Sequence, residues 1–267
     1  MTATPITSDR TVRQDKQYKR FVEDAGDRAL LEVNPGKDGT QRLFGRGPEF
    51  HAYLIAGVRR FSAAAPDYGL ARTILGKDFI SPEEIVESRR AIVYTDEQLA
   101  KFSETLPAQD VLEWCRDNGM MLVAGPPQAM SLLDIRDLNP EHFYSKQGGW
   151  YAERAQTFSR NDKAETVWIA LRKEPVQGSL RRNWAEQEAL VTDPMVVPNA
   201  AETVWCLTTY KAVRDIYLLP TLYVRTSSVD SDGGHVSVGC FGAEGLGVGS
   251  WSVSPRDGRL GVAAARK

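Results

Sequence analysis

The chain has 267 residues, of which 42% are hydrophobic and 25% charged, as in an ordinary globular protein. The formal net charge is −2 and Lys and Arg form no run, so we expect no nucleic-acid partner. Three cysteines are too few for a disulfide framework, which favours reduced thiols.

Membrane and export signals are not expected either. No apolar run reaches the length of a transmembrane helix, and the first residues lack the basic-then-apolar pattern of a signal peptide. The localisation stays open between the cytoplasm and carriage to a surface by another route.

The first part of the chain is expected to be helical. Residues 1–19 are polar, without an apolar period, and predict a disordered start; residues 20–119 form the helical N-terminal region. Ser81, followed by Pro82 and Glu84, has the spacing of a capping box, and Thr95 begins a second helix. Further helices are expected over 21–33, 49–61 and 108–118, with a turn-rich segment over 37–47.

The second part is expected to be rich in strands. The short apolar run 120–124 predicts a buried strand, and residues 165–172 are either strand or helix. Residues 130–138 and 179–191 predict helices, and the Val-, Trp-, Tyr- and Thr-rich segments 200–210 and 216–224 predict strands. Helices followed by strands indicate an α+β fold. No clear linker separates the two parts, so one compact unit is an open alternative.

The last 45 residues have the most informative pattern. Apolar residues recur at a spacing of two, as in half-buried strands, at Val236 and Val238 and again at Leu246 and Val248. Glycine, serine and histidine stand between them, although glycine inside a strand costs about 0.5–1 kcal/mol relative to alanine. Residues 221–266 contain no Lys, Asn, Gln, Met or Ile. A regular apolar frame therefore holds interleaved residues that do not follow strand propensity.

This stretch resembles the variable region of a diversity-generating retroelement protein. The resemblance rests on the frame VRTSSVDSDG, then V-x-V-G-x-F, G-L-x-V-x-x-W and a final L-G-V-A-A-A-R-K. In that family an error-prone reverse transcriptase rewrites adenines, mostly in Asn codons, which yields Ser, Gly, Cys, His, Asp or Arg but not Trp or Glu. The resemblance implies a C-type lectin-like domain over 120–267 whose variable region, about 224–267, forms a ligand-binding face.

The expected division of roles follows from the resemblance. The frame residues are expected to be buried: Val236, Val238, Phe241, Leu246, Val248, Trp251, Leu260 and Val262. The interleaved residues are expected to be exposed and to bind the ligand: His235, Ser237, Cys240, Gly242, Gly247, Gly249, Ser250, Ser252, Ser254, Asp257 and Arg259. We expect the ligand to be a protein, bound without catalysis.

No catalytic or metal motif competes with this interpretation. The chain has no P-loop and no Gly-x-Ser-x-Gly elbow, and its three histidines lack metal-ligand spacing. Glu174-Pro175-Val176 and Trp251-Ser252-Val253 lack the side-chain oxygens of a calcium-dependent lectin, so neither calcium nor another cofactor is expected. The alternatives are a structural or assembly protein of a phage or cell surface, without diversification, and an enzyme of unrecognised type.

Overall fold

The computed structural model describes residues 12–51, 53–54, 68–89, 91–252 and 256–266. Contacts divide the chain into two units, residues 1–64 and 65–267. The chain is α+β, as the sequence predicts. Within the described residues, no helix combines the length and the apolar character needed to cross a bilayer.

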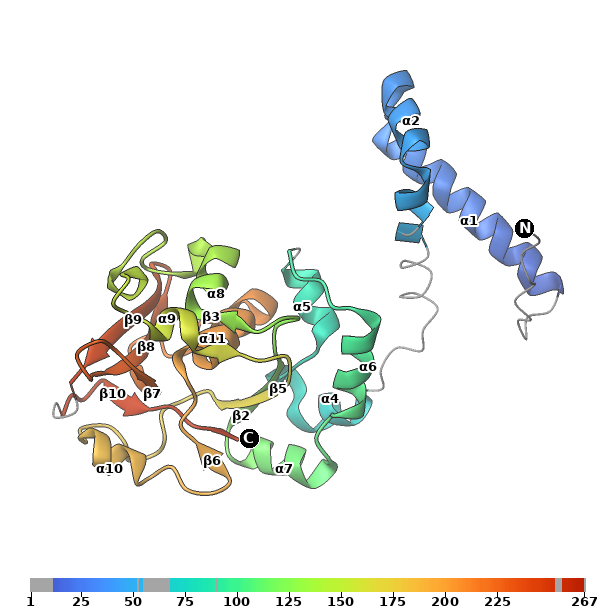
Figure 1. Cartoon of the computed structure of the whole chain (residues 1–267). Helices are drawn as coiled ribbons and strands as arrows, with labels where there is room; N and C mark the ends of the chain where they lie inside the picture. Colours follow the sequence, from blue (N-terminus) through green and yellow to red (C-terminus); the bar gives the residue numbers. More distant parts are fainter. Residues whose placement is uncertain (1–11, 52, 55–67, 90, 253–255, 267) are drawn as a thin grey trace. The chain divides into compact units, whose positions relative to one another are not determined.

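The described residues of the first unit are almost all helical (Figure 1). The long helix α1 spans Val12–Val33 and α2 spans Gly36–Gly45, with further helical residues at 47–51 and 53–54. The helix α1 begins at Val12, inside the segment 1–19 that was expected to be disordered, so that expectation is wrong from Val12 onward. The segment 37–47, which was expected to be rich in turns, is mainly helical, so that expectation is wrong too. Residues 1–11, and 55–61 of the helix expected over 49–61, lie outside the described residues.

The second unit alternates short helices and strands. Its α-helices are α4 (Gly69–Leu75), α5 (Pro82–Ser88), α6 (Asp96–Glu104), α7 (Gln109–Asp117), α8 (Leu132–Leu138), α9 (Phe158–Asn161), α10 (Trp184–Glu188) and α11 (Ala200–Arg214). Its strands are β1 (Phe79–Ile80), β2 (Met120–Ala124), β3 (Met130–Ser131), β4 (Lys163–Ala164), β5 (Trp168–Arg172), β6 (Met195–Val196), β7 (Tyr223–Val229), β8 (His235–Gly242), β9 (Gly245–Trp251), β10 (Leu260–Val262) and β11 (Ala265–Arg266).

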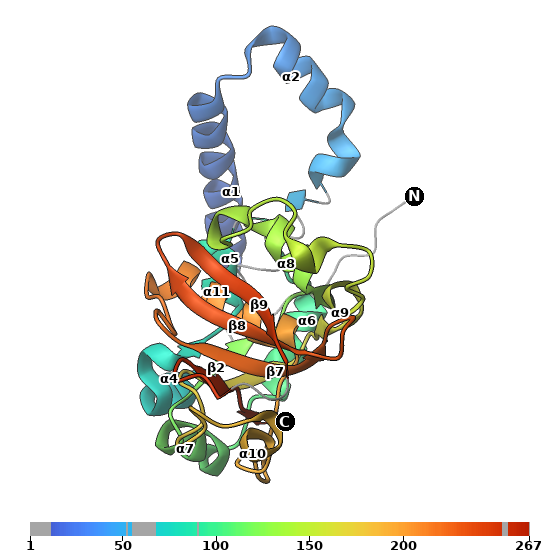
Figure 2. The ribbon, with the colours of Figure 1, turned by 90° about the vertical axis from the view of Figure 1, so that its left-hand side faces the viewer.

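Two main sheets organise this unit. One has the strand order β1-β2-β5-β11-β6 and the other β10-β7-β8-β9, beside the small pair β3-β4. Figure 2 shows β7, β8 and β9 side by side. Because β9 and β10 are the two edge strands, the connection 252–259 joins opposite edges of the second sheet.

The strand β2 is buried on both faces. Met121 and Val123 pack in the cluster around α11, whereas Met120 and Leu122 pack in a second cluster with α4 and α7. This is the two-residue alternation of a strand placed between two layers. The boundary expected between residues 119 and 120 therefore falls inside the second unit, where α7 contacts β2.

The helix α11 is the centre of the unit. All of the residues from Ala200 to Tyr210 are buried, and the helix contacts β5, β7, β8, α5 and α8. Trp205 Nε1 donates to the Ala124 carbonyl at 2.9 Å, so the helix is also joined to β2 by a hydrogen bond.

The expectation of a strand over 200–210 is therefore wrong. A helix that is buried on all sides has apolar and β-branched residues all round, which hides the helical period. Two of the three threonines fit because Thr203 and Thr208 donate their hydroxyls to the carbonyls of Asn199 and Val204, four residues earlier. Asn199 begins the helix with a capping box completed by Glu202.

Other expectations are confirmed in part. The capping boxes at Ser81 and Thr95 are present, and helices occupy most of 108–118 and 130–138. The buried strand over 120–124 is confirmed, and 165–172 contains the strand β5. The helix expected over 179–191 is limited to 184–188, and the strand expected over 216–224 begins only at Tyr223.

Replacing Asn199 by alanine is expected to lower the free energy of unfolding by about 1–2 kcal/mol, because it removes the cap of the buried helix. The matched control is Asn183→Ala, which removes the cap of the short helix α10. Its expected cost is roughly 0.5 kcal/mol. Urea denaturation measures both variants, and equal costs would contradict a central role for α11.

Acid is expected to destabilise the fold through His142. The pKa of His142 is lowered from 6.5 to about 4, first by burial and then by the positive charges of Arg89 and Lys211. The unfolded chain therefore binds this proton at a higher pH than the folded chain, and stability falls as the pH drops from about 6.5 to 4.

Thermal melting between pH 7 and 4.5 tests this prediction. The melting temperature of His142→Gln should fall less across that interval than that of the unaltered chain. An equal fall in the two proteins would contradict a role for His142.

Candidate functional site

The C-terminal strands place the expected frame residues and the expected binding residues in different surroundings. Most of the expected frame is buried, with exposed fractions of 0 or 1% at Val236, Val238, Phe241, Leu246, Leu260 and Val262. Leu260 and Val262 pair with Tyr223 and Arg225 and so lie on the other face of the sheet, where Val262 packs with Val176. The other four belong to the core around α11, and Val248 is half-buried against that core. Trp251 is also half-buried, but it pairs with His235 and so lies on the face opposite to this core. The expectation that Trp251 belongs to the buried frame is therefore wrong.

The interleaved residues lie mainly on that opposite face. Opposed residues on β8 and β9 are His235 with Trp251, Ser237 with Gly249, and Gly239 with Gly247. Ser250 instead pairs with Val236, so its side chain is on the core-facing side of the sheet, at the exposed edge strand. The expected binding residues are thus divided between two sides of the sheet. Ser254 lies outside the described residues.

Part of the opposite face is covered by the segment around α10. The imidazole of His235 stacks on Trp184, with ring centroids 3.5 Å apart and an angle of 16° between the planes. Beside it, Arg225 is fully buried and donates to Gln187 Oε1 and to the Ser252 carbonyl, both at 2.9 Å. Burial lowers the pKa of His235.

Ser237 is fully buried beside this cover, so the expectation that it is exposed is wrong. Its hydroxyl oxygen has no hydrogen-bond partner among the described residues. His235 is half-buried by Trp184. These residues could not be placed from the strand period, because the cover comes from a segment about 50 positions earlier in the chain.

Two exposed neighbourhoods remain, and the first is a tyrosine patch formed by Tyr144, Tyr223, Cys240, Gly247 and Arg259. Tyr144 is 70% exposed. A Cβ at Gly247 would lie 2.6 Å from the Tyr223 hydroxyl, so the phenol extends over this glycine. Burial raises the pKa of Tyr223, and the neighbouring Cys240 raises it further. The tyrosines were not expected as site residues, because they precede the interleaved set.

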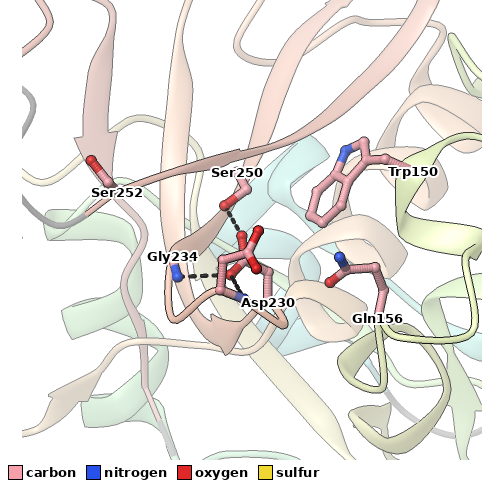
Figure 3. Close-up of a pocket in the computed structure, with 7 residues that line it drawn as sticks. Trp150, Gln156, Asp230, Gly234, Ser250 and Ser252 are labelled. Carbon is pink, nitrogen blue, oxygen red and sulfur yellow. Dashed lines mark hydrogen bonds between the residues drawn. The ribbon is translucent and has the colours of Figure 1, made fainter.

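The second neighbourhood is a shallow cleft of about 440 Å³, the Trp150 cleft. It is lined by Trp150, Gln156, Asp230, Asp232, Gly234, Ser250 and Ser252. Figure 3 shows Trp150, Gln156 and Ser250 gathered around Asp230, with Ser252 farther along the ribbon. Trp150 Nε1 donates to the Val248 carbonyl at 3.1 Å, which holds the indole against β9.

Asp230 organises the turn at the base of the Trp150 cleft. One carboxylate oxygen accepts from the backbone N–H groups of Asp232 at 2.8 Å and Gly234 at 2.7 Å, and the other accepts from the Ser250 hydroxyl. Burial raises the pKa of this carboxyl, but these hydrogen bonds lower it by more, so the pKa lies below its ordinary value. Asp230 is therefore a charged acceptor at neutral pH.

Gln156 fixes the same turn from the other side. Its amide nitrogen donates to Ser231 Oγ at 2.9 Å and its oxygen accepts from the Ser231 N–H at 3.1 Å. The cleft thus offers an aromatic ring, a fixed carboxylate and hydroxyl groups, a combination suited to binding. Within the described residues, no group of three or more His, Cys, Asp and Glu side chains could hold a metal ion.

The glycines of β8 and β9 are of two kinds. A Cβ at Gly239 would lie 2.1 Å from the Leu222 carbonyl oxygen, and one at Gly245 only 2.3 Å from the Phe143 carbonyl carbon. A Cβ at Gly242 would meet no atom within 4 Å, and one at Gly249 would meet only Ser237 Oγ at 3.6 Å. Close packing therefore explains the first two glycines, whereas the last two have room for side chains.

The connection between β9 and β10 carries the remaining expected residues. Ser252 and Arg259 are exposed, and Asp257 is half-buried. The Asp257 carbonyl accepts from the Arg181 N–H at 3.1 Å, and Arg256 forms an ion pair with Glu186 at 2.7 Å. The connection is thus attached at several points to the segment around α10.

Gly245→Ala is expected to lower the free energy of unfolding by about 2 kcal/mol or more, because the new Cβ collides with backbone atoms at a positive φ of 102°. Gly242→Ala, in open space, should change it by no more than about 0.5 kcal/mol. Chemical denaturation compares the two. Similar losses of stability in the two variants would show that close packing does not distinguish Gly245 from Gly242.

Comparison with known proteins returned no match: no family model, curated protein or solved structure is significantly similar to this chain.

Proposed function

We propose that this protein binds another protein as its ligand through its C-terminal surface. We also propose that a diversity-generating retroelement varies the residues of that surface. The observation that carries the proposal is the division of the C-terminal segment, from β8 to β10, between buried frame and surface positions. The frame is buried at six positions. The interleaved positions Cys240, Gly242, Gly247, Gly249, Ser250, Ser252, Asp257 and Arg259 are half-buried or exposed.

This division lets recognition change while the fold persists. Truncation of a buried apolar side chain costs roughly 2–5 kcal/mol, whereas substitution of an exposed residue usually changes stability by about 0.5 kcal/mol or less. A surface varied only at the exposed positions can therefore acquire new side chains without unfolding the unit.

The surroundings supply contacts that the interleaved residues lack. Glycine and serine offer little area to a partner, whereas tyrosine and tryptophan supply large, stiff contact surfaces. Tyr144 and Tyr223 lie beside Gly247, and Trp150 lies beside Ser250. We assign binding, without catalysis, to the tyrosine patch and the Trp150 cleft together, with the interleaved residues as the variable component.

The proposal includes a C-type lectin-like fold for the C-terminal part of the chain. Its support is the sequence frame from Val224 onward together with the mixed helix and strand content of the unit 65–267. The diversification and the fold can be tested separately, because diversification requires a second copy of the coding segment in the DNA.

Sequencing of the flanking locus tests the proposal. We expect a nearby reverse-transcriptase gene and a near-copy of the segment encoding residues 224–267 that differs only where the copy has adenine. The altered codons should be among those for residues 242, 249, 250, 252, 257 and 259, where side chains have room or are exposed.

The codons for buried positions are the internal control. Those for Gly239, Gly245 and the frame residue Val238 should match the copy, because side-chain changes there disturb the backbone or the core. A locus without a copy or a reverse transcriptase would contradict diversification and leave a structural or assembly protein. Alterations concentrated in frame codons would contradict the assigned surface.

A further inference from the structure

The Trp150 cleft has one aromatic wall. Trp150 is half-buried, because its ring packs against Phe158 with the centroids 5.7 Å apart, and it also lines the cleft. Figure 3 shows the indole directed toward Asp230 and Ser250. The volume of about 440 Å³ lies in the range of pockets that hold small ligands. The cleft can therefore take one long side chain of a partner, rather than a folded surface.

Two carboxylates give the cleft a negative charge. Asp230 is charged at neutral pH because its hydrogen bonds hold its pKa below the ordinary value. Asp232 is exposed at the adjoining turn. Within the part of the chain that the structure describes, neither carboxylate forms an ion pair. The negative charge of the cleft is thus available to a cation from another molecule.

The hydrogen-bonding side chains of the cleft offer more acceptors than donors. Trp150 Nε1, Gln156 Nε2 and the Ser250 hydroxyl each donate to another group of the protein. Only the Ser252 hydroxyl is an uncommitted donor with respect to the described residues. The Asp232 carboxylate can accept several hydrogen bonds and accepts none from a described residue. A ligand that fits the cleft must therefore bring donors of its own.

We propose that the Trp150 cleft receives an arginine side chain of the protein that this surface binds. A guanidinium is planar and cationic, stacks on an indole and donates several hydrogen bonds in one plane. It therefore suits an aromatic wall beside two carboxylates better than the compact ammonium group of lysine does. The inference rests on the proposed function, because it names the chemistry of a partner bound at the same surface.

The cleft also combines positions with different roles in the proposed variation. Trp150 and Gln156 precede the segment 224–267, whereas Ser250 and Ser252 are among its variable positions. Asp230 is fixed in the turn by two backbone N–H groups. An arginine bound against Trp150 and Asp230 is thus a contact that different variants can share, while the two serine positions select what surrounds it.

NMR titration of the full chain with N-acetyl-arginine amide tests the inference. We expect shifts of the Trp150 indole N–H signal and of the backbone amide signals of residues 230–234. The expected dissociation constant is about 1–10 mM, as for a single side chain. N-acetyl-citrulline amide has a similar shape without the charge, and it should bind roughly 10-fold more weakly. N-acetyl-lysine amide should bind a few-fold more weakly than the arginine probe.

Two variants of the cleft connect the shifts to its side chains. Asp232→Ser removes an exposed charge that takes no part in fixing the turn, so it should weaken binding of the arginine probe about 3-fold. Trp150→Leu removes the aromatic wall and should weaken binding roughly 10-fold, measured on the amide signals of residues 230–234. The control is Glu104→Gln, which removes an exposed carboxylate from α6 and should leave the affinity unchanged.

The results that would overturn the inference concern the cleft alone. They are equal binding of the arginine and citrulline probes, an unchanged affinity in both cleft variants, or no shift at about 50 mM probe. Any of these leaves the proposed function to the sequence of the flanking locus. A locus without a copy would instead contradict diversification and leave the measured binding of arginine intact, so the two failures are distinguishable.

Discussion

The complete burial of α11 is the constraint on which the rest of the second unit depends. A helix that is surrounded by protein needs apolar contacts on every side and internal partners for its polar groups. Most of these needs are met here, since Thr203 and Thr208 bond back to the helix backbone and Trp205 bonds to β2. The exception is the buried Thr209 hydroxyl, which has no hydrogen-bond partner among the described residues. One sheet packs on the helix through β5 and the other through β7 and β8. Loss of the helix would therefore remove the support of both sheets.

The same packing decides which parts of the C-terminal sheet are accessible. One side of β8 is directed to the α11 core through Val236 and Val238. The other side is partly closed by Trp184 and Gln187, which contact His235 and Arg225. What remains accessible is the hairpin tip, the outer part of the edge strand β9 and, among the described residues that follow it, 252, 256, 258 and 259. The tyrosine patch and the Trp150 cleft lie where neither the helix nor the α10 segment covers the sheet.

Local signals in the sequence predict much of the fold. The capping boxes at Ser81 and Thr95 depend on residues within one turn, so they can be recognised without the structure. The alternation in β8, β9 and β10 is likewise local and correctly identifies six frame residues as buried. The prediction failed at α11 because β-branched and aromatic residues, which favour strands in partly exposed sites, also fill a fully enclosed helix. Propensity cannot distinguish the two environments.

The accessible surface depends on contacts between distant residues. A period of two tells which side chains share a face, but not what lies over that face. Ser237 follows the pattern of an exposed residue and is buried by a segment far from it in the chain. Trp150 and Gln156 belong to the cleft only because the chain returns to β9 about 100 residues later. Such contacts leave no periodic signal in the sequence.

The connection between β9 and β10 has a consequence for the evolution of chain length. It joins opposite edges of a four-stranded sheet, three strand spacings or about 14 Å apart. Because β9 and β10 run in the same direction, the chain must also return along the six residues from Val229 to Tyr223, or about 20 Å, which makes the separation about 24 Å. Residues 251 to 260, if fully extended, would reach about 30 Å, so the segment has little slack. Insertions in a surface loop add only slowly to its closure entropy, whereas deletions soon exhaust that slack. Related chains can therefore be expected to lengthen here more readily than they shorten, which gives this surface a second source of variety besides substitution.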